Sequence, residues 1–159
     1  MSLAAPQSPA VNGAAFSVGI AAACFNAGLV DALLARVQAV LAAAGVKPKR
    51  ITVLRVPGSH ELPVATQWLA EGGKHDAVIA LGVLIGGDTN HHEMVGQGVA
   101  HAFQQVALAT RLPVINGVIV ADNLKQAQAR CTGRINRGAE FARAALALAA
   151  LKRTLGDQS

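Results

Sequence analysis

The sequence has no tyrosine, a single tryptophan and few charged residues, and these shortages limit what the protein can be. Basic residues are not interleaved with aromatic ones, so nucleic-acid binding is not expected despite a formal net charge of +5. Only 14% of the 159 residues are charged, against about 25% in an average globular protein. The composition favours apolar surface covered by neighbouring subunits, and it leaves open an alanine-rich monomer.

Cysteine is scarce as well, and the two cysteines have no spacing typical of a metal or redox site. We expect Cys24 and Cys131 to be ordinary packing residues in a reducing cytosol. The N-terminus lacks a basic region followed by an apolar core, so no signal peptide is expected. No apolar run reaches the roughly 18 residues of a membrane helix. These observations predict a cytoplasmic protein that binds no membrane.

The hydrophobic pattern predicts alternating strands and helices. Residues 1–14 are rich in Ala, Pro and Ser and predict a flexible arm before a single domain over 15–156. Strands are predicted at 16–24, 50–56, 76–85 and 113–120. Helices are predicted at 29–44, 61–71, 92–110, 123–131 (with Asn123 as its cap) and 137–155. This order predicts an α/β fold, a three-layer α/β/α sandwich around a central parallel four-stranded sheet, with an extra N-terminal strand possible.

A glycine-rich loop follows the third predicted strand, on the edge where ligands bind in such sheets. Gly86-Gly87-Asp88-Thr89 leads directly into a helix, so its backbone amides and the helix dipole predict an anion site. The alternative is a tight turn with no ligand. His91 comes next and could move protons near neutral pH, or simply be solvated at the helix start.

Other polar residues fall on the same edge. Histidine and glutamate at 60–61 and 91–93 are metal-ligand types, but adjacent histidines point in different directions, so no metal is expected. Phe25 could stack on a ring or plug the core. Three arginines could bind a phosphate through paired hydrogen bonds: Arg130, Arg134 and Arg137. Alternatively, they are solvated and complement the negative end of a helix dipole.

The order and spacing of these segments resemble lumazine synthase over roughly residues 16–155. The strongest match is the G-x-x-I-x-G-x-T-x-H run from Gly82 to His91, followed by Pro-Gly-x-x-Glu-x-Pro from Pro57 to Pro63. The other matching segments are Phe25-Asn26, LPVINGVIV at 112–120 and QAQARCTGRINRGAEFA at 126–142.

The resemblance implies a flavodoxin-like fold and a homopentamer, or a multiple of pentamers, with active sites between subunits. The implied activity is a transferase of riboflavin biosynthesis. It condenses 5-amino-6-(D-ribitylamino)uracil with 3,4-dihydroxy-2-butanone 4-phosphate and releases phosphate and water. No cofactor or metal is implied. The implied partners are other copies of the chain, the two small substrates and riboflavin synthase.

The resemblance also implies a role for each site residue, with His91 as the proton-transfer residue. The implied substrate-binding residues fall into groups by the part of the substrates that they meet: Phe25 and Asn26 at the pyrimidine; Ser59, His60 and Glu61 at the ribityl chain; Val83, Leu84 and Ile85 at the pyrimidine edge through their backbone; Asp88, Thr89 and Arg130 at the phosphate; Asn116 on the far wall; and Arg137 as a basic residue near the site.

The chain departs from the family pattern at four places. Gly86 stands where a basic residue is usual, His60 where an aromatic is usual, and Asn116 where some members have an aromatic. The turn 133–138 is one residue shorter than the common form. A catalytically weak or inactive shell-forming homologue that binds a flavin or pterin is therefore the alternative. A generic flavodoxin-like nucleotide or phospho-acceptor domain is disfavoured, because the strand ends lack an acidic pair.

Overall fold

The fold is built on a parallel sheet of four strands. The computed structural model describes residues 4, 6–7 and 9–157. The strands β1 (Val18–Ala23), β2 (Ile51–Val56), β3 (Ala77–Ile85) and β4 (Val114–Ala121) lie in the order β2-β1-β3-β4. All three pairings are parallel, as the sequence predicts. Over 9–17, the continuous described stretch before β1, there is no additional strand.

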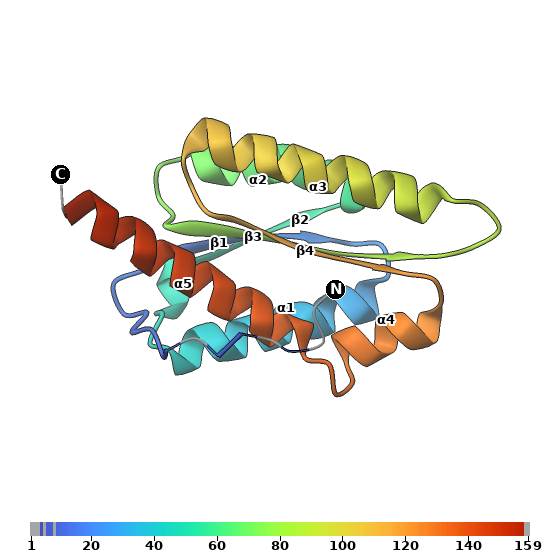
Figure 1. The fold of residues 1–159 in the computed structure, drawn as a ribbon, viewed down its shortest axis with the longest axis horizontal. Helices are drawn as coiled ribbons and strands as arrows, with labels where there is room; N and C mark the ends of the chain where they lie inside the picture. The colour runs from blue at the N-terminus through green and yellow to red at the C-terminus, as the bar shows by residue number, and fades with distance from the viewer. Residues whose placement is uncertain (1–3, 5, 8, 158–159) are drawn as a thin grey trace.

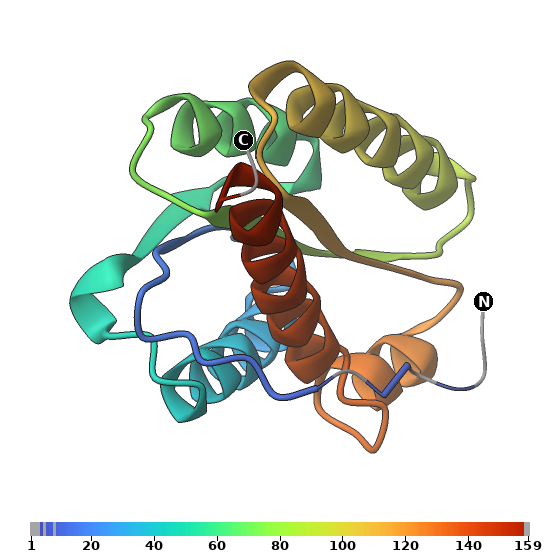
Figure 2. The same cartoon turned by 60° about the vertical axis from the view of Figure 1, so that its left-hand side comes forward.

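Five α-helices form the two outer layers. They are α1 (Ala27–Ala43), α2 (Leu62–Glu71), α3 (His91–Thr110), α4 (Leu124–Cys131) and α5 (Arg137–Asp157). Two short 3₁₀ turns, η1 (Pro48–Arg50) and η2 (Ser59–Glu61), precede β2 and α2. Helices α2 and α3 cover one face of the sheet, and α1, α4 and α5 cover the other (Figures 1 and 2). The predicted three-layer, flavodoxin-like arrangement is confirmed.

Two apolar clusters fill the space between the layers, one on each face of the sheet. The larger joins β-strand residues to α1 and α5 through side chains such as Leu33, Ile79 and Leu146. The smaller joins the sheet to α2 and α3 through Leu62 and Phe103. The first seven residues of β3 are fully buried, as expected for a strand covered on both faces.

Most helices and strands begin and end within a few residues of their predicted positions, because local sequence signals determine these ends. Asn123 caps α4 as predicted, because its Oδ1 accepts a hydrogen bond from the Gln126 amide at 3.0 Å. Gly45, with φ at 97°, follows α1 in a conformation that favours glycine. The predicted helix at 61–71 is divided between η2, which ends at Glu61, and α2.

The connections create a crevice at one edge of the sheet. The chain leaves β1 into α1 on one face, whereas it leaves β2 and β3 into α2 and α3 on the other (Figure 1). The segments that follow β1 and β3 therefore diverge between two neighbouring strands. This reversal is the usual ligand site of open parallel sheets.

The segment before β1 runs along the outside of α1. Val11 packs against the larger cluster, and the Gly13 amide donates to the Ala44 carbonyl at 2.7 Å. Residues 1–3, 5 and 8 of the predicted arm lie outside the described residues. Among the helices that the structure describes, none is both long and apolar enough to cross a membrane.

Candidate active site

A cavity of about 380 Å³ lies in this crevice. Its wall comes from the ends of β1, β2 and β3 and from the first turns of α3. Nine of the predicted site residues line it: Phe25, Asn26, Ser59, His60, Glu61, Val83, Leu84, Ile85 and His91. A larger cavity of about 660 Å³ lies between residues 9–12, α1 and α5. That cavity is lined mainly by apolar residues, whereas polar groups converge in the smaller one, as they do in ligand sites.

The first wall of the pocket follows β1. Asn26 has left-handed backbone angles, φ 55° and ψ 46°, which turn the chain sharply into α1. Its side-chain Nδ2 donates to the Val83 carbonyl at 2.8 Å and joins this loop to β3. The Phe25 amide donates to the Pro57 carbonyl at 3.1 Å, which fixes the loop against the end of β2. The Phe25 ring is 72% exposed, so it is available to a ligand and does not plug the core.

The second wall is the turn η2. The Glu61 carboxylate reaches back and accepts from the Gly58 amide at 2.9 Å, which leaves its other oxygen for a ligand. Ser59 is buried against Gly82. A side chain at position 82 would collide with the Ser59 hydroxyl. His60 is exposed at the rim. The turn thus places one imidazole and one half-buried carboxylate on the same side of the pocket.

The third wall is the loop between β3 and α3. His91 begins α3, and its amide donates to Thr89 Oγ1 at 3.4 Å. Its exposed side chain lines the pocket. Asp88 and Thr89 are exposed beside the pocket rather than in its wall, so a phosphate bound there would sit at the N-terminal end of α3.

Gly86, directly after β3, is packed closely against the end of β4. Its amide donates to the Ala121 carbonyl at 2.7 Å, and a Cβ at this position would lie 2.5 Å from the Asp122 carbonyl oxygen. That separation is shorter than any ordinary contact between a side chain and the backbone. The local packing therefore leaves no space at Gly86 for the basic side chain that the family pattern usually has at this position.

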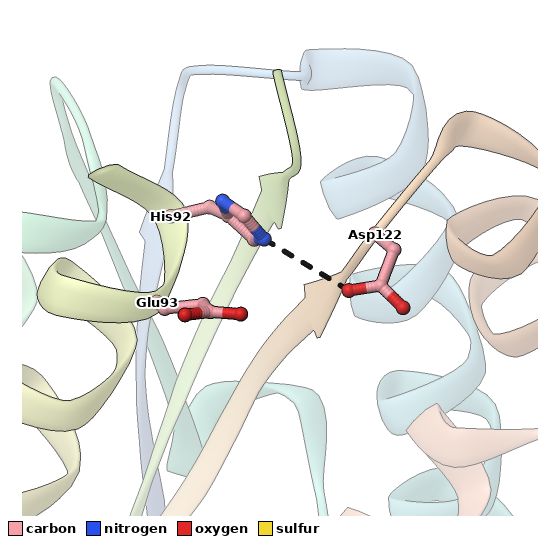
Figure 3. A group of neighbouring side chains, drawn as sticks. All are labelled: His92, Glu93 and Asp122. Carbon is pink, nitrogen blue, oxygen red and sulfur yellow. Dashed lines mark ion pairs between the residues drawn. The ribbon is translucent and has the colours of Figure 1, made fainter. Parts of the chain in front are cut away.

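His92 also lines the pocket, which the sequence analysis did not predict. Its side chain is only 11% exposed, and its Nε2 lies 4.0 Å from Asp122 Oδ1 (Figure 3). Its Nδ1 is buried and has no hydrogen-bond partner within the described part of the chain.

Glu93 extends this group, so that one ligand-type atom from each of the three residues lies within 4.8 Å of the others (Figure 3). The 4.0 Å between His92 and Asp122 exceeds the roughly 3.4 Å between neighbouring ligands of one tetrahedral zinc ion. The arrangement fits an imidazole flanked by carboxylates better than a metal sphere.

Besides Asp88 and Thr89, three more predicted site residues lie outside the pocket. The Asn116 side chain is exposed on β4 and accepts from the Val118 amide at 3.1 Å. Arg130 donates to the Gln126 carbonyl at 3.0 Å on α4. Arg137 pairs with Glu140 and lies over the Phe141 ring. The fold of one chain therefore does not bring these three side chains into the pocket.

Sequence reasoning missed three lining residues: Gly58, His92 and Val95. Gly58 and His92 stand in the motifs that pointed to the site. Val95 lies one helical turn after His91, so the spacing i, i+4 on the predicted helix could have identified it.

The two cysteines differ in environment. Cys131 is buried, as expected of a packing residue, and burial raises the pKa of its thiol to about 11. Cys24 is exposed, so the prediction that it is an ordinary packing residue is wrong. It lies just past the end of β1, where the buried strand gives way to the exposed loop.

Comparison with known proteins gives one consistent result. The family model described as 6,7-dimethyl-8-ribityllumazine synthase matches residues 15–153. A protein of that name from Polaromonas sp. (strain JS666 / ATCC BAA-500) is 41% identical over 141 residues, which cover 89% of this chain and 90% of the relative. Another from Xanthomonas campestris pv. campestris (strain B100) is 42% identical over 137 residues, 86% of this chain and 89% of the relative.

Proposed function

The chain belongs to the 6,7-dimethyl-8-ribityllumazine synthase family, and from this premise we propose how its residues carry out the reaction. The protein is a transferase of riboflavin biosynthesis. It condenses 5-amino-6-(D-ribitylamino)uracil with 3,4-dihydroxy-2-butanone 4-phosphate and releases phosphate and water. The alternative of an inactive, ligand-binding homologue is not favoured by these relatives.

His91 is the proton-transfer residue in our proposal. Imine formation, phosphate elimination and ring closure each need a proton moved near neutral pH, and imidazole is suited to that task. The observation that carries the proposal is the position of His91 at the start of α3, in the wall of a pocket that also contains Phe25 and Glu61. One such group contributes about 10²–10⁴-fold to the rate.

The pyrimidine substrate occupies the crevice between β1 and β3. The exposed Phe25 ring stacks on its flat face. Hydroxyls of the ribityl chain bind at Ser59, His60 and the free oxygen of Glu61. Backbone groups of Val83, Leu84 and Ile85 bind the edge of its ring, beside the Asn26 side chain that donates to the Val83 carbonyl.

The phosphate of the second substrate binds at Asp88 and Thr89, where backbone amides at the N-terminal end of α3 favour an anion. Arg130 reaches this phosphate from an adjacent subunit, with Asn116 and Arg137 on the same far wall. The support for this arrangement is that all three lie outside the pocket of their own chain.

We also propose that the chain forms homopentamers or multiples of pentamers. The outer faces of α2, α3 and α5 carry large exposed apolar side chains that neighbouring subunits would cover, among them Trp68, Leu108 and Leu151. Riboflavin synthase, which uses the product, is a further partner. The two unpaired cysteines are consistent with a cytoplasmic location.

The test of this function is product formation from the two substrates, followed by lumazine absorbance and corrected for the spontaneous reaction. We expect His91→Asn to lower kcat by about 10²–10⁴-fold. His101→Asn, at an exposed position on the same helix, is the matched control and should leave kcat unchanged. Equal rates for wild type and His91→Asn would refute the role of His91. Light scattering that gives a 16.2 kDa particle would refute the intersubunit site.

A further inference from the structure

Gly58 lies where the first two walls of the pocket meet. A Cβ at this position would lie 3.2 Å from Phe25 Cδ2 and 3.2 Å from Glu61 Oε2, whereas ordinary contacts begin at 3.4 Å. One neighbour is the ring that stacks on the pyrimidine in our proposal, and the other is the carboxylate that binds the ribityl chain. The missing side chain of Gly58 therefore lets both groups approach the backbone at one place.

The backbone conformation does not require glycine at this position. Gly58 has φ −145° and ψ −178°, an extended conformation that residues with a side chain also adopt. Its amide donates to Glu61 Oε2 at 2.9 Å, and the amide of another residue could donate in the same way. What position 58 requires is space beside Phe25 and Glu61.

The backbone around Phe25 brings its ring to Gly58. The Cys24 amide donates to the Val56 carbonyl at 2.8 Å, and the Phe25 amide donates to the Pro57 carbonyl at 3.1 Å. Gly58 is the next residue along this segment, and the ring lies against it. Because the ring is 72% exposed, few other atoms of the described chain restrain its orientation. Gly58 is thus the surface that fixes how the ring is presented to a ligand.

A side chain at position 58 would alter the pocket more than the stability of the fold. Both close contacts are with side-chain atoms, and an exposed ring can turn away by a few tenths of an ångström. At Gly86, in contrast, the close contacts are with backbone atoms. The expected effect of filling position 58 is therefore on ligand binding.

We propose that Gly58 is a positioning residue for the aminopyrimidine, because it sets the separation between the Phe25 ring and the Glu61 carboxylate. The proposal rests on the function proposed above, since it takes 5-amino-6-(D-ribitylamino)uracil as the ligand. This ligand joins a flat ring to a hydroxylated chain, so it meets both groups only when their separation is correct. Dispersion attraction falls steeply with distance, and a small displacement of the ring therefore weakens stacking.

The test compares the full-length wild-type protein with Gly58→Ala. We expect KM for the aminopyrimidine to rise by about 5- to 20-fold, because stacking and the hydrogen bonds of Glu61 are both weakened. KM for the butanone phosphate should change less than about twofold and kcat less than about threefold, since His91 lies on another wall. The matched control is Gly28→Ala in the first turn of α1, where a Cβ would meet no described atom within 4 Å. It should leave all three constants unchanged.

A double variant separates positioning from a general loss of packing. Phe25→Ala removes the ring that a methyl group at position 58 would displace. When Gly58→Ala is added to Phe25→Ala, the total rise in KM for the aminopyrimidine should be at least about threefold smaller than the product of the separate rises. Gly58→Ala alone should shift Tm by less than about 4 °C.

Three results would overturn the proposal. One is an unchanged KM for the aminopyrimidine in Gly58→Ala, and another is a double variant whose KM equals the product of the separate effects. The third is an equal rise in both KM values with a lower melting temperature, because that pattern indicates a structural role.

If the wild-type protein fails to accelerate the reaction, the proposed function fails instead. Calorimetric titration with the aminopyrimidine alone then decides the role of Gly58. Weaker binding by Gly58→Ala than by the wild type supports that role. Equal binding by the two proteins, or no binding by the wild type, refutes it.

Discussion

The close packing at Gly86 leads to a prediction about stability that can be worked out from the structure. A Cβ at this position would lie 2.5 Å from the Asp122 carbonyl oxygen, 3.0 Å from its carbon and 3.1 Å from its Cα. Ordinary contacts begin at 3.4 Å, so the overlap with the oxygen is 3.4 − 2.5 = 0.9 Å. All three atoms are backbone atoms, and the hydrogen bond from the Gly86 amide to the Ala121 carbonyl holds them in place.

We therefore expect Gly86→Ala to lower the free energy of unfolding by about 1–3 kcal/mol, the usual cost of overpacking. For a chain of this length, this loss corresponds to a fall of roughly 2–12 °C in Tm. Gly86→Arg, which introduces a basic side chain here, should be destabilised at least as much. Thermal unfolding by circular dichroism, at one fixed protein concentration, measures the shift in Tm.

The matched control is Gly98→Ala, in the exposed part of α3. A Cβ there would meet no described atom within 4 Å. Alanine is the better helix former, so this variant should gain about 0.5–1 kcal/mol. A Gly86→Ala protein as stable as the wild type would refute the contact argument. Equal losses in the two variants would show that glycine replacement in general, rather than the contact with Asp122, causes the effect.

Three further predictions follow from other parts of the molecule. Asn123→Ala should cost about 1 kcal/mol in chemical denaturation, whereas Asn90→Ala should cost less, because Asn90 makes no capping side-chain bond to the described chain. A thiol reagent at pH 8 should modify Cys24 quickly and Cys131 only after unfolding, since burial raises the pKa of Cys131 to about 11; two fast thiols would contradict this. Burial also lowers the pKa of His75, so its contribution to stability is present above about pH 6.5 and is lost as the pH falls; His75→Gln should reduce that loss, and an unchanged pH profile would refute it.

Much of the fold could be predicted because its signals are local. The apolar runs of the four strands, the helical periodicity between them and the cap at Asn123 all act within a few residues. Their order then restricts the topology to a parallel sheet. Cys24 shows where such reasoning fails. It ends an apolar run, but the chain emerges from the sheet one residue earlier, and the run alone does not show that change in exposure.

The site was predictable to a smaller extent. Residues at or just past the strand ends could be assigned to one edge, and nine of the predicted site residues do line one cavity there. The choice between His91 and His92 depends on the first turn of α3 and on Asp122, which is 30 residues away in the sequence. Likewise, Arg130 and Arg137 are engaged within the chain by Gln126 and Glu140, and no sequence spacing shows which residues another copy of the chain would contribute under the proposed assembly.

The backbone conformation of Asn26 limits which residues evolution can place there. The left-handed angles φ 55° and ψ 46° disfavour β-branched side chains most strongly, whereas glycine, asparagine and aspartate accept them. The hydrogen bond to the Val83 carbonyl also requires a donor, which glycine and ionised aspartate lack. Asparagine meets both demands, so we expect tolerance to substitution to be far narrower at this loop position than its exposed side chain would indicate.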